Sequence, residues 1–347
     1  MTRSSDPSSQ DCVIVDRGGI DVAVTDCEGR ILYAVGDPSR VTLARSAAKP
    51  AQAVAVIESG GFEAAGLDNV DLALMCASHS SVKRHVDVAR AMIKKVKVDE
   101  SYYRCGGHPS LSDIVNREWI QTDMKPTGIH NNCSGKHAGM MAGARALGAD
   151  VSKYHLPDQP MQILVKQVVQ ELCPEPTMIR WAVDGCNLPA PAFPLSYLAR
   201  MYALFAAAAD CADRAGECSW RTKNLSRVFT AMTANPEYVG GDGRFCTELM
   251  QRYKGLLIGK LGADGCYGIG IRENGQRQGP MGISVKIDDG NIEILYAVVM
   301  EVLERLKIGT PDMRQSLSKW HFPEKRNTMG IVTGAVSFNL KLRCMRG

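Results

Sequence analysis

Ser46 and Lys49 stand three residues apart within Arg45-Ser46-Ala47-Ala48-Lys49-Pro50, where a helix is predicted to begin. Residues three apart share one face of a helix. If burial keeps its amine neutral, Lys49 can take the proton of Ser46 and create a nucleophile. Ser-x-x-Lys recurs in acyl-transfer enzymes. So short a pattern also arises by chance, and alone it indicates a helix start with a solvated lysine.

Ser78 and Lys260 offer the same residue types at distant positions. Ser78 follows residues 72–77, a short apolar run that predicts a central strand, and Lys260 lies in a glycine-rich apolar segment typical of a strand. A serine that ends a buried strand usually bonds nearby backbone. Lysines are seldom fully buried, although an edge strand would explain one here. Each residue alone therefore indicates a structural role, and only the joint pattern favours catalysis.

Apolar periodicity predicts alternating strands and helices around these residues. Strands are expected within residues 12–35, 72–77, 181–184, 255–272, 280–287 and 330–342. Helices are expected at 50–57, 82–96, 133–147, 156–172, 195–209 and 292–306. The first and last strand segments read as hairpins, which require antiparallel pairing. We therefore expect an α/β fold in which an antiparallel sheet, closed by strands from both termini, is sandwiched by helices.

Composition limits what the protein can be. The chain has 347 residues, 45% apolar and 22% charged, with a formal charge of +4. It can bury one large core, as a single catalytic domain over 1–347 or as two closely packed lobes. No basic block with interleaved aromatic residues favours nucleic acid. No segment is long enough to span a bilayer, and residues 1–10, which we expect to be disordered, lack a secretory signal. A cytoplasmic protein is expected.

Nucleotide-binding loops and paired cysteines are missing from the sequence. No Gly-x-Gly-x-x-Gly leads from a strand into a helix, and Ser134-Gly135-Lys136 continues with His137 rather than Ser or Thr. Twelve cysteines are scattered without a Cys-x-x-Cys motif. In a reducing compartment we expect most to be small buried side chains, with one or two available for metal or catalysis.

Three further segments strengthen the opening pattern: Cys76-Ala77-Ser78-His79, residues 131–137 and Gly259-Lys260-Leu261-Gly262. Together with Trp181-Ala182-Val183-Asp184-Gly185-Cys186, their order and spacing resemble the rhizobial-type (type II family, class 3) L-asparaginases, over nearly the whole chain. This family is related in fold to serine β-lactamases and glutaminases.

The resemblance implies roles for the residues that match. Ser46 with Lys49 and Ser78 with Lys260 would form two Ser–Lys pairs, and the protein would act on L-asparagine as a homodimer. Amide hydrolysis needs a nucleophile, a base, an oxyanion donor and a proton for ammonia. We assign Ser46 as nucleophile, Lys49 as its base, and Ser78 with Lys260 as the proton relay; the reverse assignment of the serines stays open.

The resemblance also implies that Cys133, Lys136 and Cys186 bind a zinc ion near the pocket. Residue types alone would choose thiolate and imidazole, and therefore His137 instead of Lys136. A lysine can ligate only when it is neutral, and an adjacent dication favours that form. We follow the resemblance. His137 then faces the substrate or supports the metal site, and its alternative role is a bond to backbone at a helix start.

L-asparagine carries a carboxylate and an ammonium, so its pocket should contain a cation and an anion. Arg45, Asn132, His137 and Asp184 are the candidates. Arg45 could equally be a surface arginine, and Asp184 a turn cap. Glutamine is longer by one methylene, a difference worth roughly 1–3 kcal/mol in an apolar pocket, so discrimination cannot be assumed.

Two other classes of function compete. A penicillin-recognising or esterase-like Ser–Lys acyl hydrolase would normally carry Ser-Asp-Asn and Lys-Thr-Gly, and Lys260-Leu261-Gly262 only approximates the second. A non-catalytic thiolate metal or redox sensor would use Cys133 and Cys186 and leave Ser46 dispensable.

Overall fold

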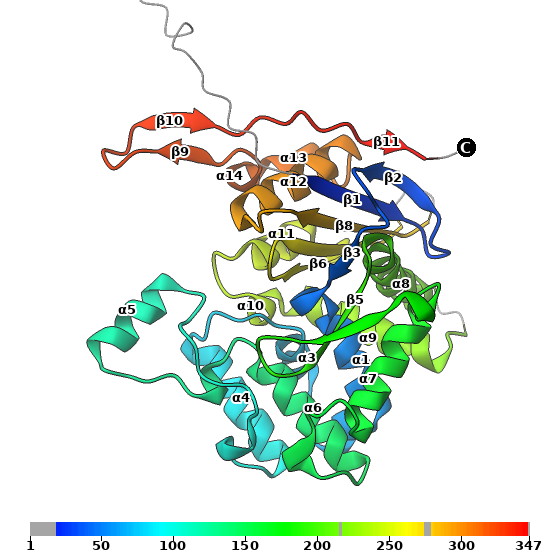
Figure 1. Ribbon diagram of the computed structural model, residues 1–347, viewed down its shortest axis with the longest axis vertical. Helices are drawn as coiled ribbons and strands as arrows, with labels where there is room; N and C mark the ends of the chain where they lie inside the picture. Colours follow the sequence, from blue (N-terminus) through cyan, green and yellow to red (C-terminus); the bar gives the residue numbers. More distant parts are fainter. Residues whose placement is uncertain (1–18, 215–216, 274–278, 346–347) are drawn as a thin grey trace, which may run out of the picture.

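The computed structural model describes residues 19–214, 217–273 and 279–345. The segment predicted to be disordered, 1–10, lies outside the described residues. A sheet occupies one half of the molecule and a group of helices the other (Figure 1). A single large cluster of buried apolar side chains runs through both halves. In the described part of the chain, no helix combines the length and apolar character that a membrane crossing requires.

The main sheet has six antiparallel strands, which confirms the predicted fold class. Their order across the sheet is β11-β2-β1-β8-β7-β6. The strands are β1 (Ile20–Thr25), β2 (Ile31–Val35), β6 (Leu257–Gly262), β7 (Cys266–Ile271), β8 (Met281–Ile287) and β11 (Arg343–Cys344). The first hairpin of the chain therefore pairs with β8, and the last strand joins the edge at β2. Both ends of the chain build one sheet, as the sequence predicts.

Alternating residues of the strands bury the two faces of the sheet against different helices. Gly282 and Gly268 face α8 (Leu195–Asp213), where a Cβ on Gly282 would lie 1.7 Å from Ala199 O and one on Gly268 would meet the Tyr202 ring. Tyr267, on the opposite face, packs against Tyr296 of α12 (Ile292–Arg305). The period of two along each strand therefore produces the helix–sheet–helix sandwich.

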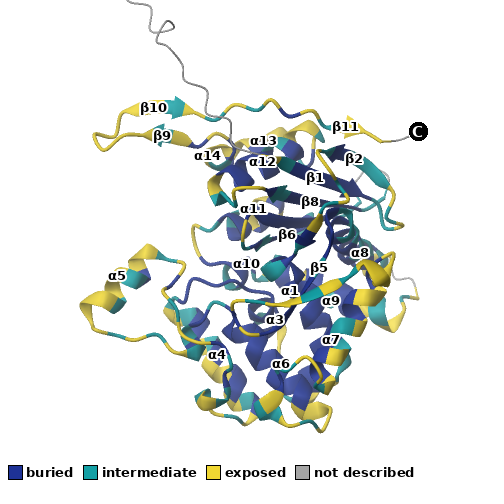
Figure 2. Cartoon of the chain, viewed as in Figure 1, coloured by how far each residue is buried: buried dark blue, intermediate teal, exposed yellow. Residues whose placement is uncertain are grey.

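The helical half is built around α6 (Ser134–Ala146), which is buried from its first turn (Figure 2). Glycines let neighbouring helices approach α6 closely; a Cβ on Gly135 would lie 2.4 Å from Leu74 O. Around it and beside the sheet lie α1 (Lys49–Glu58), α2 (Gly61–Ala64), α3 (Asn69–Met75), α4 (Lys83–Val96), α7 (Pro160–Glu171), α9 (Trp220–Ala234), α10 (Pro236–Val239) and α11 (Phe245–Tyr253). The helix α5 (Asp113–Gln121) projects away from this group (Figure 1).

The predicted strand at 72–77 is wrong, because most of this run forms α3. Asp68 caps the helix by accepting hydrogen bonds from Val70 N and Asp71 N, and the Asp71 side chain accepts one from Asp68 N. A continuous apolar run does not distinguish a buried helix from a buried strand, and the capping box decides for the helix. Ser78 therefore follows a helix, in the loop before α4.

The predicted terminal hairpin at 330–342 is also misplaced. The observed hairpin pairs β9 (Glu324–Arg326) with β10 (Val332–Ala335) and projects from the body in Figure 1. The preceding polar segment contains two short helices, α13 (Pro311–Gln315) and α14 (Ser318–His321). The chain after β10 continues to β11, whose partner is β2, so the pairing is long-range and the local pattern did not reveal it.

A second, three-stranded sheet supports the turn that carries Ser46. Its order is β3-β5-β4, from β3 (Val41–Leu43), β5 (Pro189–Pro194) and β4 (Arg180–Val183). After β3, Ala44 N donates to Pro191 O at 3.0 Å, and the chain enters the short 3-10 helix η2 (Arg45–Ala48) and then α1. Ser46 is thus held between this sheet and α1.

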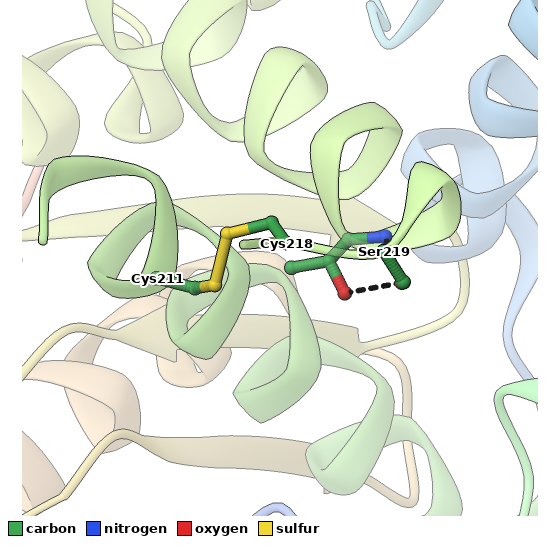
Figure 3. The surroundings of a disulfide bond; sticks show 4 residues. Cys211, Cys218 and Ser219 are labelled. Carbon is green, nitrogen blue, oxygen red and sulfur yellow. Dashed lines mark hydrogen bonds between the residues drawn. A yellow bond between two sulfur atoms is a disulfide. The ribbon is translucent and has the colours of Figure 1, made fainter. Parts of the chain in front are cut away.

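Cys211 and Cys218 form a disulfide, which corrects the expectation of cysteines without pairing. The bond joins the last turn of α8 to the residue before Ser219, the cap of α9 (Figure 3). Of the free cysteines in the described ranges, most are buried, as predicted.

Candidate active site

Ser78 lies between two buried lysines that come from different elements. Its Oγ accepts hydrogen bonds from Lys49 Nζ at 3.2 Å and from Lys260 Nζ at 2.8 Å. Lys49 is the first residue of α1 and also donates to Ala77 O; Lys260 belongs to β6 and also donates to Leu261 O at 2.7 Å. The two lysines are 0% and 1% exposed. Both amines can therefore exchange protons through one hydroxyl.

Burial, and then the charge of Lys49, lower the pKa of Lys260 to about 7. A buried ammonium loses hydration, and a second cation nearby disfavours its charged form. At neutral pH the lysine pair can lose one proton at little cost. This is the property that a general acid–base pair needs.

Ser46 lies in η2, one turn before Lys49, and is half-buried. The phenolic hydroxyl of Tyr202 in α8 donates to Ala47 O at 2.8 Å and anchors this turn. Among the described residues no hydrogen bond joins Ser46 Oγ to Lys49, whose Nζ is directed to Ser78. Catalytic hydrogen bonds often form only when substrate is bound, so this spacing is compatible with a Ser46–Lys49 pair.

Arg45 precedes Ser46 and has a left-handed backbone, with φ 52°. Its Nε contacts Asp184 Oδ1 at 2.6 Å, and its Nη1 contacts Asp264 Oδ2 at 2.5 Å. A non-glycine residue in this region is strained and needs support from its surroundings. The two ion pairs supply that support. The two charged candidates for substrate binding, Arg45 and Asp184, are thus paired with each other.

Burial raises the pKa of Asp184, but the charges of Lys136 and Arg45 outweigh it and hold the pKa below its usual value. Asp184 is therefore ionised at neutral pH. Asp264 was not a candidate from the sequence, because Ala263-Asp264-Gly265 reads as an ordinary turn between β6 and β7. Tyr202 was missed as well, although a tyrosine within an alanine-rich helix could have signalled a polar contact.

Cys133, Lys136 and Cys186 converge next to Asp184, and we call them the thiol–ammonium cluster. Cys133 caps α6, Lys136 lies in its first turn, and Cys186 lies in the turn between β4 and β5. Lys136 Nζ donates to Cys186 Sγ at 3.0 Å. All of the cluster is buried, at 4%, 3% and 6% exposure in chain order.

The cluster has a defined charge pattern. A hydrogen bond from Cys133 and the charge of Lys136 outweigh burial and lower the pKa of Cys186 to about 5. That hydrogen bond, together with burial, raises the pKa of Cys133 to about 12. Burial would lower the pKa of Lys136, but the two sulfurs and Asp184 raise it above its usual value. In the absence of a metal, the cluster is a thiolate–ammonium pair beside a neutral thiol.

His137 and Asn132 lie beside the cluster. Tyr154 OH accepts from Arg104 N at 2.9 Å, so its own proton points to His137 Nδ1, at 2.6 Å. Burial, and then the charge of Lys136, lower the pKa of His137 to about 3. His137 is therefore neutral with its proton on Nε2, a buried atom without a hydrogen-bond partner in the described structure. Asn132 Oδ1 lies 3.0 Å from Cys133 Sγ.

The side chains of the cluster fit a zinc ion if Lys136 is neutral. Two sulfurs, one of them already a thiolate, are ligands that zinc prefers, and Lys136 can join them only after it loses its proton. Lys136 rather than His137 lies against Cys186. Within the described ranges, no group of three or more His, Cys, Asp or Glu side chains is placed to hold a metal. A metal here would therefore need the lysine.

A probable glutaminase from Bacillus subtilis, complexed with 6-diazo-5-oxo-L-norleucine, is 13% identical, with 88% of this chain and 85% of that chain covered and a TM-score of 0.39. The covalent complex between the Bacillus subtilis glutaminase YbgJ and 5-oxo-L-norleucine is 10% identical, with 83% and 87% covered and a TM-score of 0.38. Scores this low carry no argument about the site.

Among curated proteins no significant match was found. The family model for L-asparaginase II matches residues 15–338, which is most of the chain and includes every candidate site residue. The chain therefore belongs to the L-asparaginase II family, the amidohydrolases that act as asparaginases.

Proposed function

We propose that this protein hydrolyses the side-chain amide of L-asparagine through a serine nucleophile. The observation that carries the proposal is the position of Ser78 Oγ between Lys49 Nζ and Lys260 Nζ. Lys49 in turn lies one helical turn after Ser46. Family membership supports the substrate, and the lysine-bridged serine supports the serine chemistry.

Ser46 is the proposed nucleophile and Lys49 its base. Ser78 Oγ bonds both amines, so a proton on the lysine pair can be passed to Lys260, and Lys49 can then accept another. Lys49 then takes the proton of Ser46 as Ser46 Oγ bonds to the amide carbon. Backbone amides at the start of a helix lack intrahelical acceptors, so the Ser46 N–H is a suitable donor to the oxyanion.

Ser78 and Lys260 complete the proton transfers. Ser78 gives its proton to the departing nitrogen and receives one from Lys260, and ammonia leaves an ester on Ser46. Neutral Lys260 then removes a proton from water through Ser78. The resulting oxygen attacks the ester, and Lys49 returns its proton to Ser46. The new β-carboxyl group leaves in its protonated form, and its proton passes to ammonia in solution. The cycle thus ends with L-aspartate, ammonium and one proton on the lysine pair, so protons and charges balance.

We propose that Arg45 and Asp184 bind the carboxylate and the ammonium of L-asparagine. They lie within one ion-paired network next to Ser46, and a zwitterionic substrate can replace part of each pairing with its own opposite charge. His137 can add a neutral donor from Nε2, and Asn132 a side-chain amide. Discrimination against L-glutamine is left to experiment.

We propose that Cys133, Lys136 and Cys186 would hold a zinc ion. When bound, zinc would supply positive charge that helps to orient the substrate. Asp184 belongs to the proposed substrate pocket and also lies next to Cys186 of the cluster. This position supports a role for zinc in placing the substrate over a role in the Ser–Lys chemistry. Assembly as a homodimer and a cytoplasmic location stay predictions from the sequence.

Ammonia release from L-asparagine and, separately, L-glutamine tests the proposal, with Ser46→Ala, Ser78→Ala and the exposed control Ser39→Ala. We expect both active-site variants to lose activity and the control to keep it. A mass increase of a covalent acyl group on the native protein, absent from Ser46→Ala and present on Ser78→Ala, would identify Ser46 as the nucleophile. The opposite pattern would reverse the two serines. Activity of Ser46→Ala at the native level would contradict the proposal.

A further inference from the structure

The segment from Ala77 to Ser81, which carries Ser78, is fastened to several parts of the molecule. Ser78 N donates to Val239 O at 3.0 Å, and His79 N donates to Asn132 O at 3.2 Å. Ser81 Oγ donates to His130 O at 2.7 Å. These bonds hold the backbone on both sides of Ser78. None of these three bonds reaches α6 itself, which begins at Ser134.

The His79 side chain makes that connection. It is 0% exposed, and its two ring nitrogens are both engaged. Ser81 N donates to Nδ1 at 3.1 Å, so Nδ1 is the acceptor and the ring proton lies on Nε2. Nε2 lies 2.9 Å from Ser134 Oγ and therefore donates to it.

Ser134 is the first residue of α6, between Cys133 and Lys136 of the thiol–ammonium cluster. The imidazole of His79 thus connects the loop that carries Ser78 to the first turn of α6, where Cys133 and Lys136 lie. The ring also stacks on His85, with centroids 5.1 Å apart and planes inclined by 25°, which fixes its orientation. Both residues joined by the hydrogen bond, His79 and Ser134, are 0% exposed.

We propose that His79 is a positioning residue, which sets the relative placement of Ser78 and the thiol–ammonium cluster through its hydrogen bond to Ser134. This inference rests on the proposed function, because it assumes that Ser78 takes part in proton transfer and that the cluster borders the substrate. His79 itself touches neither substrate nor reacting atoms. Its role is to keep the Ser78 hydroxyl at the correct distance from the substrate. A displacement of about 1 Å between reacting groups can lower the rate by about 100-fold.

The imidazole stays neutral while it does this. Burial, and then the charges of His85, Lys49 and more distant histidines, lower the pKa of His79 well below its usual value. The ring therefore keeps its proton on Nε2 at neutral pH. A neutral side-chain amide can replace either the acceptor Nδ1 or the donor Nε2.

Two substitutions separate the two ring contacts. His79→Asn retains an acceptor that can bond Ser81 N, as in an Asx turn, but is too short to reach Ser134. His79→Gln can place its amide nitrogen near the position of Nε2 and retain the donor to Ser134. We expect His79→Asn to lower kcat by about 10-fold to 100-fold with a smaller change in KM, and His79→Gln to stay within about threefold of native.

Ser134→Ala removes the other end of the same bond, and Ser284→Ala is its matched control. Ser284 is also 0% exposed and also makes one hydrogen bond, to Leu195 O at 2.7 Å, but lies in β8. Ser134→Ala should reproduce the loss of kcat, and Ser284→Ala should keep native kcat. The double variant His79→Asn/Ser134→Ala should be no worse than the poorer single variant, because both remove one interaction.

Kinetics are measured at a temperature at which circular dichroism shows each variant to be folded. Native kcat in His79→Asn or in Ser134→Ala, equal losses in His79→Asn and His79→Gln, or additive losses in the double variant would each overturn the inference. If neither His79 variant folds, the comparison of kcat between Ser134→Ala and Ser284→Ala tests the inference alone. Activity in Ser46→Ala and Ser78→Ala would instead overturn the proposed function, so the two failures are distinguishable.

Discussion

Lys260 Nζ lies 2.8 Å from Ser78 Oγ, although 182 positions separate the two residues in the sequence. The contact forms because β6 runs beside η2, which leads directly to Lys49, and Lys49 also donates to the Ser78 hydroxyl. Two cations are thereby buried around one serine. This arrangement opposes stability, since each charge has lost its hydration, and it supplies the lowered pKa that proton transfer requires.

Replacing Lys260 with methionine should stabilise the fold and abolish activity. Below pH 7 the native side chain, with its pKa of about 7, is buried in the charged form, whereas methionine carries no charge. We expect the free energy of unfolding to rise by roughly 2 kcal/mol near about pH 6, measured by urea denaturation. Lys83→Met, at a lysine whose side chain is 89% exposed, is the control and should change stability little. A destabilised Lys260→Met would contradict a buried charge.

The activity should depend on pH through the lysine pair. The pKa of Lys260 is lowered to about 7, so its amine is charged below that pH and largely neutral above it. The singly protonated pair is the active form in the proposed mechanism. We expect kcat/KM for L-asparagine to rise with pH, with an apparent pKa near 7, when measured between about pH 5 and about pH 9. A flat profile across this range would exclude the lysine pair as the titrating unit.

The free energy of unfolding of the native protein should also rise with pH above about pH 7. The folded-state pKa of Lys260 is depressed, so between about pH 7 and the usual lysine pKa of 10.5 the unfolded chain binds the additional proton. Stability rises wherever the unfolded state binds more protons. Lys260→Met should lack this component of the rise, and the difference between the two denaturation profiles isolates it from other titrating groups.

Loss of Cys133 should weaken the proposed zinc site and substrate binding more than the chemical step. Cys133→Ala removes a sulfur donor and the hydrogen bond that lowers the pKa of Cys186. We expect less zinc bound, by elemental analysis of the purified protein, and a KM raised several-fold more than kcat falls. Cys173→Ala, at another buried cysteine, is the control. Equal falls in kcat and kcat/KM would show that the cluster acts in the transition state.

The disulfide should contribute to stability and not to catalysis. Cys211 and Cys218 close a short loop at the C-terminal end of α8, beyond Tyr202, which anchors the Ser46 turn. For a loop of this length the chain-entropy model gives about 2 kcal/mol. Replacing both cysteines with serine should lower the free energy of unfolding by about that amount and leave kcat unchanged. A fall in kcat would indicate that the end of α8 controls the position of Tyr202.

Parts of the site could be predicted because they depend on local spacing. Ser46 and Lys49 share a helix start, and Cys133 and Lys136 share the first turn of α6, so a period of 3.6 residues brings each pair near one face. The first hairpin, the strand pair of β6 and β7 and the long helices were predicted for the same reason: each has a regular alternation of apolar residues. The strand expected at 72–77 failed because a fully apolar run carries no period, and the cap at Asp68 decided its structure.

The sequence by itself determined which chemical groups are present and which neighbours they have along one turn or one strand. Only the tertiary structure decided that Ser78 lies between Lys49 and Lys260, that Arg45 pairs with Asp184 and Asp264, and that His79 bridges to Ser134. These contacts join segments from different elements, and their distances follow from the packing of the sheet against α1, α6 and α8. The depressed pKa of Lys260 has the same origin, because burial and a neighbouring charge are properties of the folded chain and not of the residue.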